Sequence, residues 1–320
     1  MKRSRGLYAA VALVLAAAAT DAARAQDTLE RAQILRPSKT AASFSVELPV
    51  LARVQGTAFF RTSVTITNNT NKNGVIARYQ FSYTCVASTC APPGGFYRTG
   101  VQTITLDGLD SFHQDDFIQF LDSQALLQTG AVQGAIGTLL VTFDNLDTAN
   151  GWEGAVIGRT YNRIVETDPT RGTVGFAYNS SLFFESADTT LVATLRDTKA
   201  VPTVAGALRS NLGIRNTDIN GTNQNVSVEL EFYDTATGQR VGNRINFAGI
   251  QPGELRQVSD VWVSAQIPAT VTGVIAFADV LNPTATSPTI EGYVTIIEGQ
   301  STQDAAFFEM KCADTDPCGN

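Results

Sequence analysis

Histidine is nearly missing from this sequence, since His113 is the single one among 320 residues. A Ser-His-Asp hydrolase needs a histidine as its general base, so His113 would have to serve. It lies in the polar stretch Ser111 to Asp116, where a structural role in a turn is a simpler interpretation than a base or a metal ligand. The G-x-S-x-G, P-loop, dinucleotide-binding and H-E-x-x-H motifs are absent as well. These absences predict that the protein is not an enzyme.

Long apolar runs are also missing. The apolar run from Leu7 to Ala19 has 13 residues, whereas a membrane-spanning helix needs about 20. Basic residues precede this run, and Ala23-Arg24-Ala25 follows it. This order is typical of a cleavable signal peptide, so we expect residues 1–25 to be removed on export and residues 26–39 to form a polar tether. The alternative interpretation of this N-terminal segment is a membrane anchor. The predicted location is the periplasm or the cell exterior.

Positive charge is scarce after this processing. Residues 1–25 carry four of the 23 basic residues and one of the 30 acidic residues, which leaves 19 and 29 and a net charge of −10. A negative surface repels nucleic-acid phosphates and anionic membranes. We therefore expect no nucleic-acid partner and no membrane insertion, and a protein or a glycan as the partner.

Cysteine is limited to four residues in two close pairs. Export favours disulfides over free thiols, and the spacing favours Cys85–Cys90 and Cys312–Cys318. Zinc binding is the rival interpretation, but neither pair has C-x₂-C spacing and His113 is the only histidine.

The chain contains an internal repeat. Five blocks of the first half recur in the same order in the second half. The matches are Phe60–Asn68 with Leu208–Asn216, Tyr79–Phe81 with Leu230–Phe232, Ile104–Leu109 with Ile245–Ile250, Gly137–Leu139 with Gly273–Ile275, and Glu153–Val156 with Glu291–Val294. We interpret this order as a duplicated domain.

Apolar residues alternate with polar ones in these blocks. Val226, Val228, Leu230 and Phe232 alternate with Ser227, Glu229 and Glu231, which is typical of a strand with one buried and one wet face. Asn- and Gly-rich turns separate the strands. The sequence therefore predicts an all-β protein of two tandem Ig-like or jelly-roll-type β-sandwich domains, residues 40–185 and 186–311, with a disulfide-closed tail over residues 312–320.

One helix is expected between the strands of the first domain. Asp115 or Asp116 can cap it, Phe117 begins its apolar face, and the pattern extends to Gln128. Its counterpart near residues 259–264 is shorter and is expected to be at most a turn. An additional strand is predicted around Gly175 to Tyr178, directed toward the second domain.

The blocks resemble a group of uncharacterised secreted bacterial proteins with tandem β-domains. The resemblance lies in the aromatic-Arg-Thr-x-apolar-x-apolar-x-Asn strand at Phe60–Asn68 and in Arg159-Thr160-Tyr161-Asn162. The second domain departs from it, with Ile297-Glu298-Gly299 where Arg-Thr-Tyr would stand. The resemblance implies no catalytic residues.

Charged residues that recur in both copies are candidates for structural pairs. Arg61 and Arg209 occupy matching positions, as do Glu153 and Glu291. We expect Arg61 to pair with Glu153 and Arg209 with Glu291 on an outer strand face, where an exposed pair contributes about 0–1 kcal/mol. The alternative is that these are unrelated surface charges.

Ligand sites are less well marked. No cofactor is predicted, and calcium is the candidate ion at three Asn/Asp-rich turns: residues 216–221, 144–147 and 314–316. A backbone role is the simpler interpretation of such turns. Four aromatic residues could form a sugar platform, although packing is their usual role. These are Tyr97, Trp152, Tyr161 and Trp262.

Taken together, these patterns predict a secreted, non-enzymatic structural, adhesive or interaction protein. A carbohydrate-binding module, with or without calcium, is the alternative. A glycoside hydrolase that uses only carboxylates is a third possibility.

Overall fold

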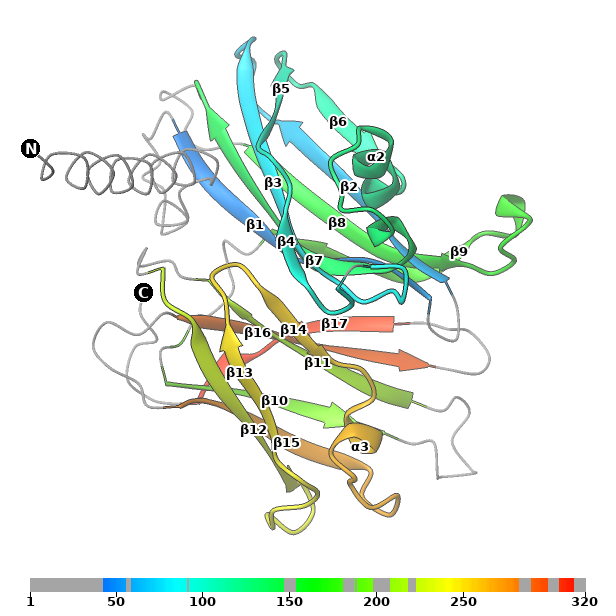
Figure 1. Ribbon diagram of the computed structural model, residues 1–320, viewed down its shortest axis with the longest axis vertical. Coiled ribbons are helices and arrows are strands. Elements are labelled where there is room, and N and C mark those ends of the chain that lie inside the picture. Colours follow the sequence, from blue (N-terminus) through cyan, green and yellow to red (C-terminus); the bar gives the residue numbers. More distant parts are fainter. Residues whose placement is uncertain are drawn as a thin grey trace, which may run out of the picture.

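Antiparallel strands dominate the molecule, and two lobes are visible (Figure 1). The computed structural model describes residues 43–55, 59–90, 92–146, 154–180, 187, 189–197, 208–217, 223–281, 289–298 and 305–313. The expected signal peptide, the tether and the boundary near residue 185 lie outside the described residues. The all-β sandwich fold predicted from alternation is confirmed.

The first lobe is a sandwich of two sheet arms that share one continuous hydrogen-bonded path. One arm has the order β5–β3–β7–β1, with β4 also on β3, and the other has the order β6–β2–β8–β9. Its strands are β1 (Ser43–Gln55), β2 (Phe59–Asn68), β3 (Val75–Cys85), β4 (Phe96–Arg98), β5 (Gln102–Leu106), β6 (Ser111–Gln114), β7 (Ala135–Asp144), β8 (Gly154–Arg163) and β9 (Thr173–Asn179).

The second lobe has two separate sheets. Their orders are β13–β12–β15–β10–β18 and β14–β11–β16–β17. The strands are β10 (Thr190–Arg196), β11 (Leu208–Asn216), β12 (Val226–Asp234), β13 (Ile245–Ile250), β14 (Leu255–Val258), β15 (Gly273–Val280), β16 (Ile290–Glu298), β17 (Ala305–Glu309) and β18 (Lys311–Cys312).

The two lobes repeat one topology. In chain order, β1, β2, β3, β5, β6, β7, β8 and β9 occupy the places that β10 to β17 occupy in the second lobe. The described residues of all five repeated sequence blocks fall on strands that are equivalent in this sense, although residues 107–109 of one block lie beyond the end of β5. A duplication of the chain would give this correspondence.

Strand β1 passes from one arm of the first sandwich to the other. Its register with β7 shifts between Leu48 and Leu51, and Pro49 lies inside this bulge. Proline in a strand is accommodated at a bulge because it has no N–H to donate to the ladder. Beyond the bulge, Val54 pairs with Phe60 of β2. Strand β1 therefore joins the two arms by pairing with β7 along most of its length and with β2 at its end.

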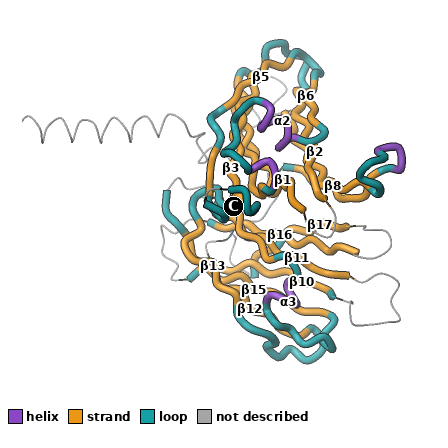
Figure 2. Tube along the Cα trace, turned by 45° about the vertical axis from the view of Figure 1, so that its right-hand side comes forward, coloured by secondary structure: helices purple, strands orange, loops and turns teal. Residues whose placement is uncertain are grey.

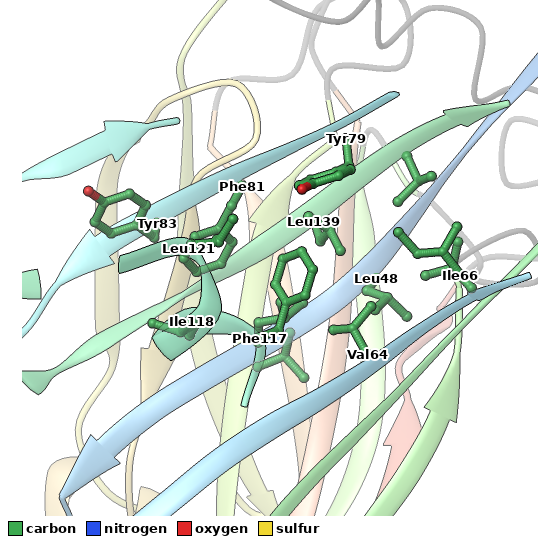
Figure 3. Packing of buried hydrophobic residues seen from close by; sticks show 14 of the residues in the cluster. Leu48, Val64, Ile66, Tyr79, Phe81, Tyr83, Phe117, Ile118, Leu121 and Leu139 are labelled. Carbon is green, nitrogen blue, oxygen red and sulfur yellow. The ribbon is translucent and has the colours of Figure 1, made fainter. Parts of the chain in front are cut away.

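The core of the first lobe lies between its arms (Figure 3). Helix α2 (Phe117–Ser123) lies over this core and inserts Phe117, Ile118 and Leu121, all fully buried. Asp116, one of the two residues predicted as the cap, accepts a hydrogen bond from the Gln119 N–H at 3.1 Å. The helix ends at Ser123 rather than near Gln128.

A second helix, α3 (Val261–Ser264), stands at the place where at most a turn was expected. Asp260 caps it as Asp116 caps α2, by accepting a hydrogen bond from the Val263 N–H. Single 3₁₀ turns occur at η2 (Ala131–Gln133) and η3 (Pro169–Arg171). The first sandwich and the second thus each carry a short, Asp-capped helix.

The Cys85–Cys90 disulfide is confirmed. Cys312, expected in a separate tail, instead lies in β18 and pairs with Leu191 of β10, so the second sheet extends into the expected tail. Its predicted partner Cys318 lies outside the described residues. Phe176 and Tyr178 of the predicted additional strand lie in β9, which pairs with β8 and faces the second lobe.

The asparagine that ends each repeated strand ties two sheets together. Asn68 and Asn216 have no exposed surface. The Asn68 amide donates to the carbonyls of Lys72 and Asp107, and the Asn216 amide donates to those of Gln224 and Ile250. Each amide therefore joins its own strand to the end of a strand in the facing sheet.

Replacing Asn216 by alanine should lower the free energy of unfolding by about 1–3 kcal/mol, because the buried Ile250 carbonyl and the part-buried Gln224 carbonyl lose their donor. The control Asn246→Ala removes an exposed asparagine of β13 and should change stability by no more than about 0.5 kcal/mol. Urea unfolding monitored by tryptophan fluorescence measures both. Equal effects of the two substitutions would contradict the structural role of Asn216.

Candidate functional site

The two sandwiches meet face to face. Strands β11 and β16 of the second lobe lie between the first lobe and the rest of the second (Figures 1 and 2). Their odd-numbered residues point away from the second core, and Asn211, Arg215 and Tyr293 among them are buried nonetheless. On the first lobe, Glu47 of β1 and Thr138 of β7 are fully buried in the same way. Outer strand faces that usually meet water are therefore packed against each other.

A buried ion triad joins the lobes at one end of this junction. The Arg215 guanidinium bonds Glu291 through Nε, at 3.1 Å, and through Nη2. Its Nη1 lies 3.0 Å from Oε2 of Glu47, an ion pair that is not aligned as a hydrogen bond. The side chains of Arg215 and Glu47 are 2% and 0% exposed. One cation from the second lobe is thus held by carboxylates of both lobes.

The electrostatic environment keeps this arginine charged. Burial lowers the pKa of Arg215, but attraction by Glu291 and Glu47 outweighs burial, so the pKa lies above its usual value. An uncompensated charge in this position would cost several kcal/mol. The triad therefore favours one relative position of the lobes, because only that position supplies both carboxylates.

Aromatic rings make a second contact between the lobes. The Phe307 ring of β17 stacks on Tyr178 of β9 at 5.1 Å and on Tyr293 of β16 at 5.2 Å, measured between ring centroids. The Tyr293 ring covers Gly213 of β11, where an added Cβ would lie 2.4 Å from it. Glycine is needed there to leave room for the ring, and the ring in turn reaches the first lobe's side of the junction.

Backbone carbonyls of the β13–β14 turn add polar contacts. The Thr138 hydroxyl donates to the Gly253 carbonyl at 3.2 Å, and the Arg98 guanidinium donates to the Pro252 carbonyl. These bonds satisfy polar groups on the first lobe with acceptors of the second. The junction therefore combines an ion triad, stacked aromatic rings and hydrogen bonds.

A cavity of about 430 Å³ lies at the other end of the junction. Along β11 the outward residues run from Arg215 in the triad to Asn211 and Arg209 at the cavity. Both lobes line it, and its described lining consists of Val50, Ala52, Val54, Gln55, Phe60, Thr84, Val86, Ile136, Thr160, Phe176, Arg209, Asn211, Leu255, Arg256, Gln257, Ser259, Tyr293, Thr295 and Ile297. This volume lies in the range of about 300–1,000 Å³ that is usual for ligand pockets.

The structural pairs predicted from the repeat have different partners. Glu291 lies opposite Arg215, whereas Arg209 lies opposite Ile297 at the other end of the same strand pair. The Arg209–Glu291 pair was therefore assigned to the wrong arginine, because sequence matching cannot give the register of β11 on β16. Arg209 lines the cavity instead.

In the first lobe, Arg61 binds Glu166, and its guanidinium lies 4.8 Å from the centroid of the Phe59 ring. Glu153, the predicted partner of Arg61, lies outside the described residues. The two matching arginines therefore have different surroundings in the two lobes.

His113 lies on the exposed side of β6. Its Nδ1 is 2.8 Å from the Thr65 hydroxyl, and its Nε2 is 3.0 Å from a carboxylate oxygen of Asp115. A hydroxyl, an imidazole and a carboxylate thus lie in a row, but the Asp115 side chain is 89% exposed. A catalytic triad needs a carboxylate buried enough to hold the imidazole in one orientation, and Asp115 does not meet this condition.

The aromatic candidates that the structure describes are packing residues. Trp262 is buried and donates its indole N–H to the Val271 carbonyl at 2.7 Å. Tyr161 donates to the Asp115 carbonyl, and the Tyr97 ring lies 5.7 Å from that of Tyr83. Trp152 lies outside the described residues.

The calcium candidates are described only in part. Asn216 and Thr217 are fully buried and hydrogen-bonded to protein groups, and Asp144 binds Arg78. The remaining acidic residues of these turns, including Asp147 and Asp314, lie outside the described residues. Among the residues that are described, no group of three or more His, Cys, Asp or Glu could hold a metal ion.

Comparison with known proteins identifies no family. No protein-family model matches the chain, and no curated protein matches it. Solved structures that are similar include a protein of Parabacteroides distasonis described as secreted, at 9% identity over 89% of this chain and 93% of that one, with a TM-score of 0.19. The Pleurotus ostreatus lectin is 8% identical over 89% of this chain and 87% of its own, with a TM-score of 0.20.

The tip adhesin CupB6 of Pseudomonas aeruginosa is 8% identical over 86% of this chain and 93% of its own, with a TM-score of 0.14. TM-scores this low carry no argument about function. In the part of the chain that the structure describes, no helix is long and apolar enough to cross a membrane.

Sequence reasoning missed Glu47 and Arg215. Leu212 and Ile214 alternate with Gly213 and Arg215, a pattern that is consistent with the outer position of Arg215. An outward charge is normally interpreted as solvent-exposed, and nothing in the sequence showed that a second sheet covers it. A glutamate inside the otherwise apolar run from Val46 to Ala52 was the available signal for Glu47.

Replacing Arg215 by methionine should lower the free energy of unfolding by about 3–5 kcal/mol, because two buried carboxylates lose their cation. The triple variant Glu47→Leu/Arg215→Met/Glu291→Leu removes all three charges and should recover most of this loss. The control Arg240→Met changes an exposed arginine and should have an effect below about 0.5 kcal/mol. Urea titration measures the free energy of unfolding of all three variants. A small effect of Arg215→Met alone would contradict the proposed importance of the triad.

The buried tyrosines of the junction predict loss of stability at high pH. Burial raises the pKa of Tyr178 and Tyr293 well above the ordinary value of 10.0. The contribution of these two tyrosines to the free energy of unfolding is complete below about pH 10. It is lost as the pH rises further, because the unfolded chain releases these protons first. The slope is about −1.4 kcal/mol per pH unit for each such tyrosine.

In the variant Tyr178→Phe, this slope should be less steep by up to about 1.4 kcal/mol per pH unit. Denaturant titrations at several values between about pH 8 and pH 11.5 measure it. Parallel pH profiles of the variant and the original protein would contradict the prediction.

Proposed function

We propose that the protein is a secreted, non-enzymatic structural, adhesive or interaction protein of the bacterial periplasm or cell exterior. In this proposal two β-sandwiches, derived from one duplicated domain, act as a single rigid body that binds a protein or a glycan surface. The observation that carries the proposal is the buried junction between the lobes, which contains the Glu47–Arg215–Glu291 triad at one end. Tandem domains that worked independently would not need to bury three charges between them.

Export is supported by the Cys85–Cys90 disulfide, because such bonds persist in oxidising compartments. The duplication is supported by the common strand order of the lobes. The resemblance of the repeated blocks to secreted tandem β-domain proteins is consistent with both export and duplication. Membership of that group of proteins is part of the proposal.

A non-enzymatic role is supported by the positions of the carboxylates. Glu47 and Glu291 lie near one another through their common cation, but both are buried in the junction and out of a substrate's reach. His113 lies on an exposed strand beside a solvent-exposed aspartate. Carbohydrate binding is the alternative, and it would need a surface other than Trp262 and Tyr161, which are packed.

The test is saturable binding of the labelled exported protein to cell-envelope fragments of the producing organism. The original protein should bind saturably, and the variant Arg215→Met should bind at least tenfold more weakly, because its lobes no longer hold one relative position. The exposed-site variant Arg240→Met should bind like the original.

A glycan array with and without a calcium chelator separates the carbohydrate alternative from protein recognition. Release of soluble sugars from the fragments would identify a hydrolase instead. Absence of saturable binding to the envelope and to the array would contradict the proposal.

A further inference from the structure

We infer that the cavity between the lobes binds an apolar molecule that carries one carboxylate, of the chemical type of a medium-chain fatty acid. The inference goes beyond the proposed surface role and does not depend on it. It follows from three features of the lining: an apolar body, an unpaired cation and a buried hydroxyl without a partner.

The apolar part of the cavity comes from both lobes. Val50 and Ile136 of the first lobe and Leu255 and Ile297 of the second are each less than one-tenth exposed and line it. Phe60 and Phe176 add aromatic surface. An aliphatic chain placed there would lose contact with water on most sides, which is the main favourable contribution to binding an apolar ligand.

The charged part of the cavity is positive. Arg209 and Arg256 line it, and none of the described lining residues is acidic. Arg256 is paired with Glu254 at 2.5 Å. Within the described residues, no hydrogen bond or ion pair engages the Arg209 side chain. In a protein with an excess of acidic residues, an arginine without a carboxylate partner beside an apolar cavity is suited to an anionic ligand group.

The hydroxyl of Thr84 supplies the second, independent observation. Thr84 is 9% exposed and lines the cavity, and its Oγ1 is buried without a hydrogen-bond partner among the described residues. A buried hydroxyl without a partner is unfavourable. The hydroxyls and amides of Thr160, Asn211, Thr295 and Gln257 in the same lining have protein partners. Thr84 is thus a donor available to a ligand oxygen.

The polar and apolar features together select the ligand class. A sugar would need many hydrogen-bonding groups in the lining, and most of those present are already bonded to protein atoms. A small inorganic anion would leave the apolar walls unused. A chain with one terminal carboxylate uses the apolar walls, Arg209 and the Thr84 hydroxyl at once.

The test is isothermal titration calorimetry of the exported protein with decanoate, 1-decanol and acetate. Decanoate should bind with a stoichiometry of one. Decanol, which lacks the charge, should bind at least tenfold more weakly, and acetate, which lacks the chain, should not bind. Absence of decanoate binding, or equal affinity for decanoate and decanol, would overturn the inference.

Variants locate the site. Arg209→Gln should weaken decanoate binding by about ten- to a hundredfold, the usual effect of losing a bond to a charged group, and should leave decanol binding unchanged. Arg240→Gln, the matched exposed control, should bind decanoate like the original. Val54→Trp should fill the cavity and abolish binding of both decanoate and decanol.

Thr84→Val tests the hydroxyl without endangering the fold. Because no described residue bonds this hydroxyl, its removal should leave the melting temperature unchanged or raise it, while decanoate binds several-fold more weakly. A lower melting temperature with unchanged affinity would show a structural role for Thr84 and contradict this part of the inference. Decanoate binding that survives in Val54→Trp would place the ligand elsewhere and overturn the assignment of the cavity.

Discussion

The burial of Arg215 between carboxylates of two lobes is the constraint on which the arrangement of the molecule depends. Its guanidinium bonds Glu291 in its own sheet and lies 3.0 Å from Glu47 in the other lobe. A buried triad contributes little net stability compared with apolar packing, but it strongly disfavours any arrangement in which one member lacks its partners. Its main effect here is therefore on the relative orientation of the lobes.

The junction between the lobes contains the triad at one end and the cavity at the other. From the triad, the outward residues of β16 run through Tyr293, which contacts Phe307 by aromatic stacking, to Thr295 and Ile297 at the cavity. The aromatic contact lies between the two ends. The cavity is thus a consequence of how two sandwiches with the same topology meet, and neither lobe encloses it alone.

Alternation in the sequence predicted the strands well wherever one face meets water. In β12, Val228 and Leu230 are buried while Glu229 and Glu231 are not. Helix-capping rules offered Asp115 or Asp116 for the start of α2, and the structure has Asp116 there. In β11 and β16, alternation did not reveal that the outer face is covered, because both faces are buried. Periodicity tells which residues share a face; it does not tell what covers that face. The register that sets Arg215 rather than Arg209 opposite Glu291, and the lobe that supplies Glu47, follow only from contacts between distant segments.

The most direct test of the account measures the distance between the lobes. Spin labels at Ser111 and Thr237, both exposed and in different lobes, allow pulsed electron paramagnetic resonance on the whole protein. The account predicts a single narrow distance distribution for the original protein and a broad one after Arg215→Met. A broad distribution in the original protein, or an unchanged narrow one in the variant, would contradict the claim that the buried triad holds the lobes in one position.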